Sequence, residues 1–226
     1  MIGEKMQKNL SSYVNIIRAV KTVGFSLFQN KFGEEYFIWN INSEKEVALT
    51  FDDGPSNGNT EKVLKILEEE SIKAMFFLIG EQVKKYPKVA KEIVEQGHLI
   101  GNHTLTHRNL RKLGSSEIEE ELLITQKIIT DVTGVSPKIM RPPMGRISFR
   151  AAEIAKRLGL KTIMWSKSAK DYKMMGADFV LKRLNSKNIK SGDIILFHDG
   201  NEDAVNALRG VLRDLKNGGY RFGLIN

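Results

Sequence analysis

The chain has no cysteine, only five prolines and no long apolar run. Without cysteine there is no disulfide and no thiolate metal site, so any metal must be held by histidine and carboxylate side chains. The strongest apolar run, residues 74–79, is too short to span a bilayer, and residues 1–5 lead into no long apolar core. We therefore expect no transmembrane segment and see no signal peptide; the sequence as written suits the cytoplasm but leaves the compartment open.

The composition is that of a folded globular protein. Of 226 residues, 41% are hydrophobic and 27% charged, which suits a single domain with one substantial core. The formal net charge of +8 could attract anionic polymers, a membrane surface or cell-wall material. Because Lys and Arg are scattered along helix-like segments, we expect a solvated surface instead and no nucleic-acid partner.

From Val47 onward, short β-branched or aromatic runs alternate with segments of helical periodicity, the pattern of parallel strands joined by helices. The predicted strands are 47–51, 74–78, 99–101, 138–140, 162–165, 194–197 and 220–224. The predicted helices are 60–69, 116–130 (opened by a capping box of Ser116 and Glu119), 149–158, 178–184 and 204–215. About seven such units favour a β/α barrel over an open sheet.

The N-terminal part differs from this repeat. Residues 12–28 carry apolar side chains at helical spacing, which predicts an amphipathic helix. We expect it to pack on the barrel; the alternative is a surface helix resting on a membrane or a partner. Residues 1–43 are thus assigned to a helical extension and residues 44–226 to the barrel domain.

Two adjacent aspartates follow the first predicted strand, in the sequence TFDDGP of residues 50–55. Neighbouring side chains in a strand point to opposite faces, so Asp52 and Asp53 can serve one site only if the backbone turns there. Gly54-Pro55 supplies such a turn. Two adjacent carboxylates also repel each other unless a cation or an arginine compensates their charge.

Three of the four histidines follow predicted strands. His103 and His107 are four residues apart, so they can meet on one side of a helical turn or tight loop, as metal-ligating pairs do. With one aspartate they would form a three-ligand site that leaves a coordination position open, as in catalytic zinc. His198 lies at the carboxyl end of another strand, where β/α barrels build active sites, whereas His98 is most simply structural.

Arg141 opens the sequence RPPMG of residues 141–145, where two prolines stiffen the loop and Gly145 permits close backbone approach. In order, TFDDGP, His-x-x-x-His, RPPMG and Leu-x-His resemble the polysaccharide deacetylase family, the NodB-homology group of carbohydrate esterase family four. The resemblance covers residue 47 to the C-terminus and implies a distorted β/α barrel.

The resemblance also implies roles for individual residues. The metal ligands are Asp53, His103 and His107, and the ion is most often Zn²⁺, with Co²⁺, Mn²⁺, Ni²⁺ or Fe²⁺ as alternatives. The catalytic residues are Asp52 as general base, Arg141 holding that base, His198 as general acid, Asp171 orienting the acid, and Met144, whose backbone N–H stabilises the oxyanion. The substrate-binding residues are Pro143, Trp165, Tyr172 and Leu196.

The sequence departs from the family pattern at three positions. Where the family has Asp-x-x-Asp-Trp, residues 168–172 read SAKDY, so Ser168 replaces the first Asp and Tyr172 the Trp. Met144 replaces the usual aromatic residue. Because the oxyanion contact would come from the Met144 backbone, that change should spare the chemistry and reshape the groove that grips the sugar.

We therefore expect a metal-dependent hydrolase that removes N-acetyl groups from amino sugars of a glycan, either peptidoglycan, a chitin-like chain or a related glucosamine polymer. Alternatives are the same machinery acting on a non-sugar amide or an O-acetyl ester, and an inactive glycan-binding module. Two His and one carboxylate also occur in iron oxygenases, but such a site has no need for a second Asp, a paired Arg and an acid His. The family often acts at the cell envelope; the sequence does not specify the oligomeric state.

Overall fold

The computed structural model describes residues 26–225. The predicted N-terminal helix therefore lies largely outside the described residues, and of its range only residues 26–28 are seen, within a helical segment that runs to residue 32. No described helix is long and apolar enough to cross a membrane.

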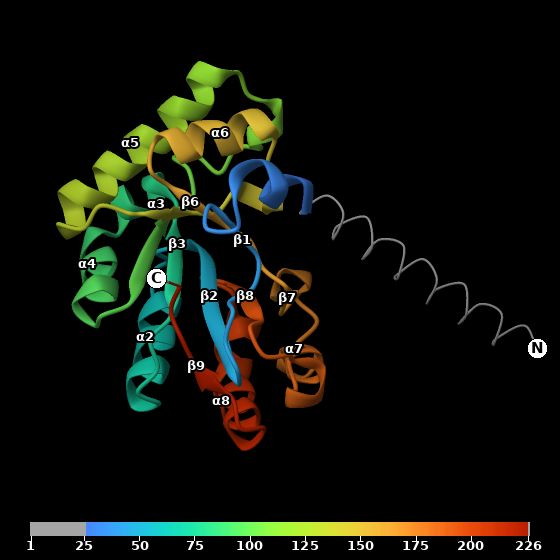
Figure 1. The fold of residues 1–226 in the computed structure, drawn as a ribbon. Helices are drawn as coiled ribbons and strands as arrows, with labels where there is room; N and C mark the ends of the chain where they lie inside the picture. Colours follow the sequence, from blue (N-terminus) through green and yellow to red (C-terminus); the bar gives the residue numbers. More distant parts are fainter. Residues whose placement is uncertain (1–25, 226) are drawn as a thin grey trace, which may run out of the picture.

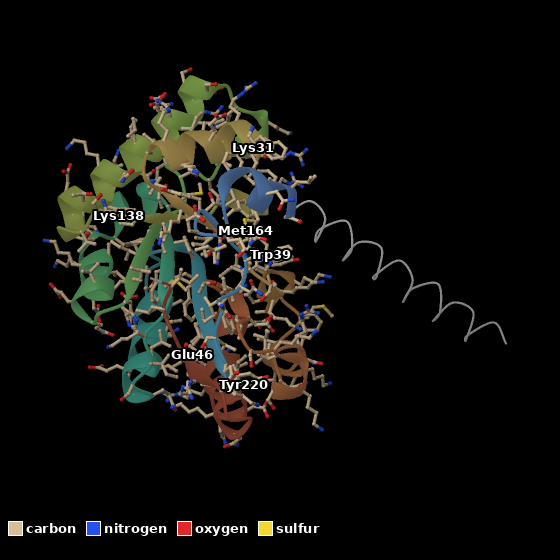
Figure 2. The ribbon with its side chains drawn as sticks, in the orientation of Figure 1. Lys31, Trp39, Glu46, Lys138, Met164 and Tyr220 are labelled. Atoms are coloured by element: carbon tan, nitrogen blue, oxygen red, sulfur yellow. The ribbon has the colours of Figure 1, made fainter. Side chains whose placement is uncertain are left out.

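A curved sheet of parallel strands forms the centre of the molecule (Figure 1). Its strands are β1 (Phe37–Ile38), β2 (Glu46–Gly54), β3 (Met75–Leu78), β4 (Leu99–Asn102), β5 (Ile139–Met140), β6 (Lys161–Ile163), β7 (Lys167–Ser168), β8 (Ile194–His198) and β9 (Arg221–Phe222). The order is β1-β6-β5-β4-β3-β2-β8-β7, with β9 paired to the start of β2, where Figure 2 places Glu46 near Tyr220. Strands β1 and β7 stand at the two ends of this order, and an antiparallel bridge joins Asn40, after β1, to Asp193, before β8. The predicted distorted β/α barrel is confirmed.

Helices cover the outside of this sheet (Figure 1). They are α2 (Asn59–Glu69), α3 (Gly80–Lys85), α4 (Pro87–Glu95), α5 (Ser115–Thr133), α6 (Phe149–Arg157), α7 (Ala177–Arg183) and α8 (Glu202–Asn217). Short 3-10 turns lie at Leu110–Lys112, Pro143–Gly145, Asp171–Lys173 and Ser186–Asn188. Two of these turns carry predicted site residues.

The sequence prediction missed four elements. Strands β1 and β7 have two residues each, too few for an alternation to be read. Helices α3 and α4 are short and meet at Tyr86, where Pro87 starts a new helix.

The predicted start of α5 was wrong. The helix begins at Ser115, and Glu117, not Glu119, accepts a hydrogen bond of 2.9 Å from the N–H of Gly114. Glu119 instead pairs with Arg157 at 3.1 Å. Ser116 and Glu119 have the spacing of a capping box, but the helix begins at Ser115, so Ser116 lies inside the helix and cannot cap it.

Strand β2 shows how the core positions the site. Val47, Leu49 and Phe51 belong to the core between sheet and helices, whereas Ala48 belongs to a second cluster with Met75 of β3. Side chains alternate along a strand, so residues 48, 50 and 52 share the inner face of the barrel. This alternation places a threonine and an aspartate inside the barrel, at its carboxyl end.

Candidate active site

The two adjacent aspartates face one site because the backbone turns at Asp53 itself. Asp53 has a left-handed φ of 74°, and the register between β2 and β3 shifts between Asp52 and Gly54. Such a bulge breaks the alternation of side chains. The expected turn is therefore present, one residue earlier than Gly54-Pro55.

Asp53, His103 and His107 form a compact cluster of possible ligand atoms, all within 4.8 Å of one another. The Nε2 atoms of His103 and His107 each lie 3.2 Å from Oδ1 of Asp53. His103 is buried at the end of β4, whereas the side chain of His107 is 31% exposed on the loop that follows. The segment is a loop and not a helical turn.

The tautomer of His103 follows from its hydrogen bond. Its Nδ1 lies 2.8 Å from the backbone oxygen of Arg141, and because a carbonyl can only accept, Nδ1 carries the proton. The neutral ring therefore presents the lone pair of Nε2 to Asp53. A ring nitrogen fixed in this way is typical of metal-binding histidines.

This arrangement fits a divalent cation. Oδ1 of Asp53 is buried and has no hydrogen-bond partner within the described part of the chain. It faces the Nε2 atoms of His103 and His107, so a carboxylate oxygen and imidazole nitrogens converge on one point. Burial raises the pKa of Asp53, but the two nearby imidazoles outweigh it and hold that pKa well below the usual range, while Asp53 raises the pKa of His107. A cation at that point would be bound by all three atoms.

Arg141 holds Asp52 from inside the barrel. Its Nη1 donates hydrogen bonds of 2.7 Å to Oδ1 of Asp52 and to the hydroxyl of Thr50. Nε and Nη2 donate to the backbone oxygens of Ile163 and Met164, at 3.0 and 2.8 Å. The guanidinium is fully buried, and burial lowers the pKa of Arg141 while Asp52 raises it. This ion pair fixes the orientation of the Asp52 carboxylate.

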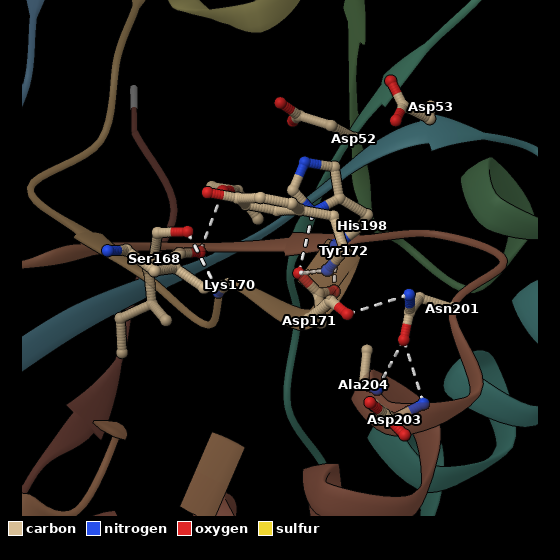
Figure 3. Close-up of polar contacts among 12 residues, drawn as sticks. Asp52, Asp53, Ser168, Lys170, Asp171, Tyr172, His198, Asn201, Asp203 and Ala204 are labelled. Carbon is tan, nitrogen blue, oxygen red and sulfur yellow. Dashed lines mark hydrogen bonds and ion pairs between the residues drawn. The ribbon is translucent and has the colours of Figure 1, made fainter. Parts of the chain in front are cut away.

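His198 is oriented by Asp171 on the other side of the site (Figure 3). Oδ1 of Asp171 lies 2.8 Å from Nδ1 of His198, and Oδ2 accepts a 2.7 Å hydrogen bond from the His198 backbone N–H. Burial lowers the pKa of His198, but the bond and charge of Asp171, with the charges of Asp52 and Asp53, raise it above the ordinary value. His198 is thus placed to hold a proton opposite the two aspartates.

The loop after Arg141 presents its backbone to the site. Met144 has a left-handed φ of 57°, and its N–H donates no hydrogen bond within residues 26–225. Gly145 also has a positive φ of 65°, and a Cβ there would lie 2.6 Å from the ring of Trp165. The loop can therefore lie on Trp165 only with glycine at this position.

The predicted substrate-binding residues fall into two groups. Tyr172 is 55% exposed and its ring packs edge-on against His198, with centroids 5.4 Å apart. Trp165 is half-buried beneath Gly145. Pro143 and Leu196 are buried, although Leu196 shares its strand face with His198. Exposed apolar contact to a sugar is thus available from Tyr172 and from the side chain of Met144.

Sequence reasoning missed two supporting residues. Thr50 lies two residues before Asp52, so strand alternation could have placed it beside that carboxylate. Asp199 follows His198 and is buried, with hydrogen bonds from Thr60 at 2.7 Å and Ser56 at 2.9 Å. Burial raises the pKa of Asp199 to about 6. No local pattern indicated that partner set, which comes from a distant loop and helix.

Comparison with known proteins agrees with this geometry. The polysaccharide deacetylase family profile matches residues 40–163. A peptidoglycan-N-acetylglucosamine deacetylase of Bacillus cereus is 37% identical over 83% of this chain and 90% of its own length. Other curated relatives are longer, and the match covers as little as 39% of their length.

Two solved structures have the same fold. One is a carbohydrate esterase family four pseudoenzyme from Bacillus anthracis, with a TM-score of 0.78 and 33% identity over 82% of this chain and 66% of that one. The other is a peptidoglycan N-acetylglucosamine deacetylase in complex with an N-hydroxybenzamide, with a TM-score of 0.78 and 36% identity over 81% and 87% of the two chains. By sequence profile, relatives and fold, this chain belongs to the polysaccharide deacetylase family.

Proposed function

We propose that this protein is a metal-dependent N-deacetylase acting on amino sugars of a glycan, with peptidoglycan as the first candidate. The observation that carries the proposal is the convergence of three kinds of group at the carboxyl ends of the strands. The groups are a ligand cluster, a carboxylate held by an arginine, and a histidine held by an aspartate. The relatives named as peptidoglycan deacetylases support the choice of glycan.

Asp53, His103 and His107 would hold the metal ion. Zinc is the first candidate because His and carboxylate ligands suit it, with cobalt, manganese, nickel or iron as alternatives. When bound, the ion would supply Lewis-acid chemistry that polarises the acetamide carbonyl and acidifies water.

The chain's own residues would then carry out the proton transfers. Asp52, held in position by Arg141, accepts a proton from the water that attacks the acetamide carbon. The N–H of Met144 donates to the developing oxyanion. His198 gives its Nε2 proton to the nitrogen as the C–N bond breaks, so acetate and a free amine are released.

The pattern of site residues argues against an inactive module. A pseudoenzyme of this family exists with the same fold, so fold alone does not establish activity. In this chain the proposed base, its arginine and the ligands form one connected network, and His198, held by Asp171, lies opposite Asp52 in the register of strands β8 and β2. Catalysis needs such a network, whereas glycan binding alone does not.

The test is acetate release from N-acetylated chito-oligosaccharides and from peptidoglycan. Protein treated with a chelator should release none, and refilling with zinc or cobalt should restore release on at least one substrate. Chelated protein that remains equally active would contradict the metal dependence. If metal-loaded protein releases no acetate from either glycan, that result would contradict a glycan substrate and favour a non-sugar amide or an O-acetyl ester.

A further inference from the structure

The loop between the two histidine ligands has a strained backbone. Thr104 and His107 both have left-handed φ values, 68° and 58°. For residues other than glycine this conformation costs free energy and persists only where the surroundings impose it. The contacts around the loop should therefore show what fixes the position of the second ligand.

The two histidines are fixed in different ways. His103 ends a strand, its side chain is 2% exposed and its Nδ1 is bonded to the backbone of Arg141. The imidazole of His107 has Asp53 as its sole polar partner among residues 26–225, and its side chain is 31% exposed. The position of His107 thus depends on the loop backbone and not on a bond to its own ring.

One buried carboxylate holds that backbone. Oε2 of Glu121, in the first half of α5, accepts hydrogen bonds of 2.8 Å from the N–H of Leu105 and 2.9 Å from the N–H of Thr106. Oε1 accepts the hydroxyl proton of Thr106. Glu121 is 5% exposed, so these bonds are little weakened by competing water.

The opposite side of the loop is held by α3. The N–H groups of Gly80 and Glu81 donate to the backbone oxygens of Thr104 and Leu105, at 3.0 and 3.1 Å. These are main-chain bonds that no substitution of a side chain removes directly. The side chain of Asn102 also accepts the N–H of Thr104 at 2.9 Å, at the His103 end of the loop. Glu121 is therefore the side chain that holds the part of the loop nearer His107.

We infer that Glu121 is a positioning residue that sets metal affinity by fixing the loop that presents His107. It does not belong to the ligand cluster and touches no predicted catalytic side chain. Partners of this kind around metal ligands commonly change metal affinity by about 10- to 100-fold when mutated. The inference rests on the proposed metal site and names what tunes it.

The test compares Glu121→Gln with Glu120→Gln in the full chain. Glutamine is nearly isosteric but neutral: with its amide oxygen turned to the two N–H groups, it replaces charge-assisted hydrogen bonds with weaker neutral ones and turns its NH₂ group toward the Thr106 hydroxyl. Glu120 is the preceding residue of the same helix and is exposed, so Glu120→Gln removes the same charge without touching the loop. Zinc affinity is measured by chelator competition, ligand geometry by the visible spectrum of the cobalt form, and stability by thermal unfolding of the metal-free proteins.

We expect Glu121→Gln to bind zinc about 10-fold or more weakly and to alter the cobalt spectrum, with Glu120→Gln within twofold of wild type. Thr106→Ala, which removes only the hydroxyl contact with Glu121, should weaken binding in the same direction by a smaller factor. This milder variant keeps the inference testable if Glu121→Gln does not fold.

If Glu121→Gln and Thr106→Ala both bind zinc within twofold of wild type and unfold at a lower temperature, then Glu121 contributes to stability and does not set metal affinity. That result would overturn the inference and leave the proposed function standing. Wild-type protein that bound neither zinc nor cobalt would overturn both.

Discussion

The imidazole of His103 and the backbone of Arg141 are joined by a 2.8 Å hydrogen bond, from Nδ1 to the carbonyl oxygen. The guanidinium of the same arginine holds Asp52 at 2.7 Å. One residue thus fixes both a proposed metal ligand, through its backbone, and the proposed base, through its side chain. A side-chain substitution at residue 141 can therefore separate these two roles.

Arg141→Met should lower the free energy of unfolding by about 3–5 kcal/mol, because it leaves Asp52 buried without its partner. It should also abolish turnover, since the base loses its orientation. Denaturant unfolding and acetate release measure the two effects. Thr50→Val is the matched control: it removes the hydrogen bonds of the Thr50 hydroxyl with Arg141 and with the backbone oxygen of Ile195, and should cost about 1–3 kcal/mol. Equal costs for the two variants would contradict the assigned importance of the Arg141 and Asp52 pair.

Asp53→Asn and His103→Ala should both lose bound metal, because each removes a member of the three-atom cluster. Asp52→Asn should retain metal, since Asp52 lies 3.9 Å from His103 and is held by Arg141. Metal content of the purified proteins, after equilibration with zinc, measures this. If Asp52→Asn and Asp53→Asn lost metal equally, the roles of the two aspartates would have been assigned wrongly.

Asp171→Asn should shift the alkaline limb of the pH–rate profile to lower pH. The bond and charge of Asp171 raise the pKa of His198 against the effect of burial, so their loss lowers it. The acid must be protonated to act, and a lower pKa means that the proton is lost at lower pH. The measurement is kcat against pH in both proteins. If the alkaline limb lies at the same pH in both, His198 is not the general acid.

Asp199→Asn should remove a pH dependence of stability. The pKa of Asp199 is raised by burial from 3.8 to about 6, so the folded protein binds the proton more tightly than the unfolded chain does. The contribution of Asp199 to the free energy of unfolding of the wild type is therefore greatest below pH 3.8. It falls by up to about 3 kcal/mol as the pH rises through about 6. Stability measured by denaturant unfolding between pH 4 and pH 7 should rise in Asp199→Asn relative to wild type as pH increases. A difference that stays constant over this range would contradict the prediction.

Much of the fold could be predicted because each long strand carries its own signal. The β-branched and aromatic runs before Asp52 and His198 mark two strands by composition alone. The two-residue strands β1 and β7 carry no such signal, because their pairing is imposed by neighbours distant in sequence. The division of the chain at residues 43 and 44 stays a prediction.

The candidate site was predictable where residues are close in sequence or part of a motif. Asp171 and His198 are brought together at 2.8 Å, as the family resemblance implied. The support of the site was not predictable, because Glu121 and Asp199 act through contacts with loops far along the chain. The left-handed conformation of Asp53 was likewise not evident from the residues themselves.

The most direct test of the central claim is acetate release from peptidoglycan by zinc-loaded wild-type protein and zinc-loaded Asp52→Asn, side by side. With equal metal content, the wild type should release acetate and the variant should be slower by about 10³-fold, the range expected for loss of a general base. Equal rates in the two proteins, or no acetate from the wild type on any N-acetylated glycan, would contradict the account.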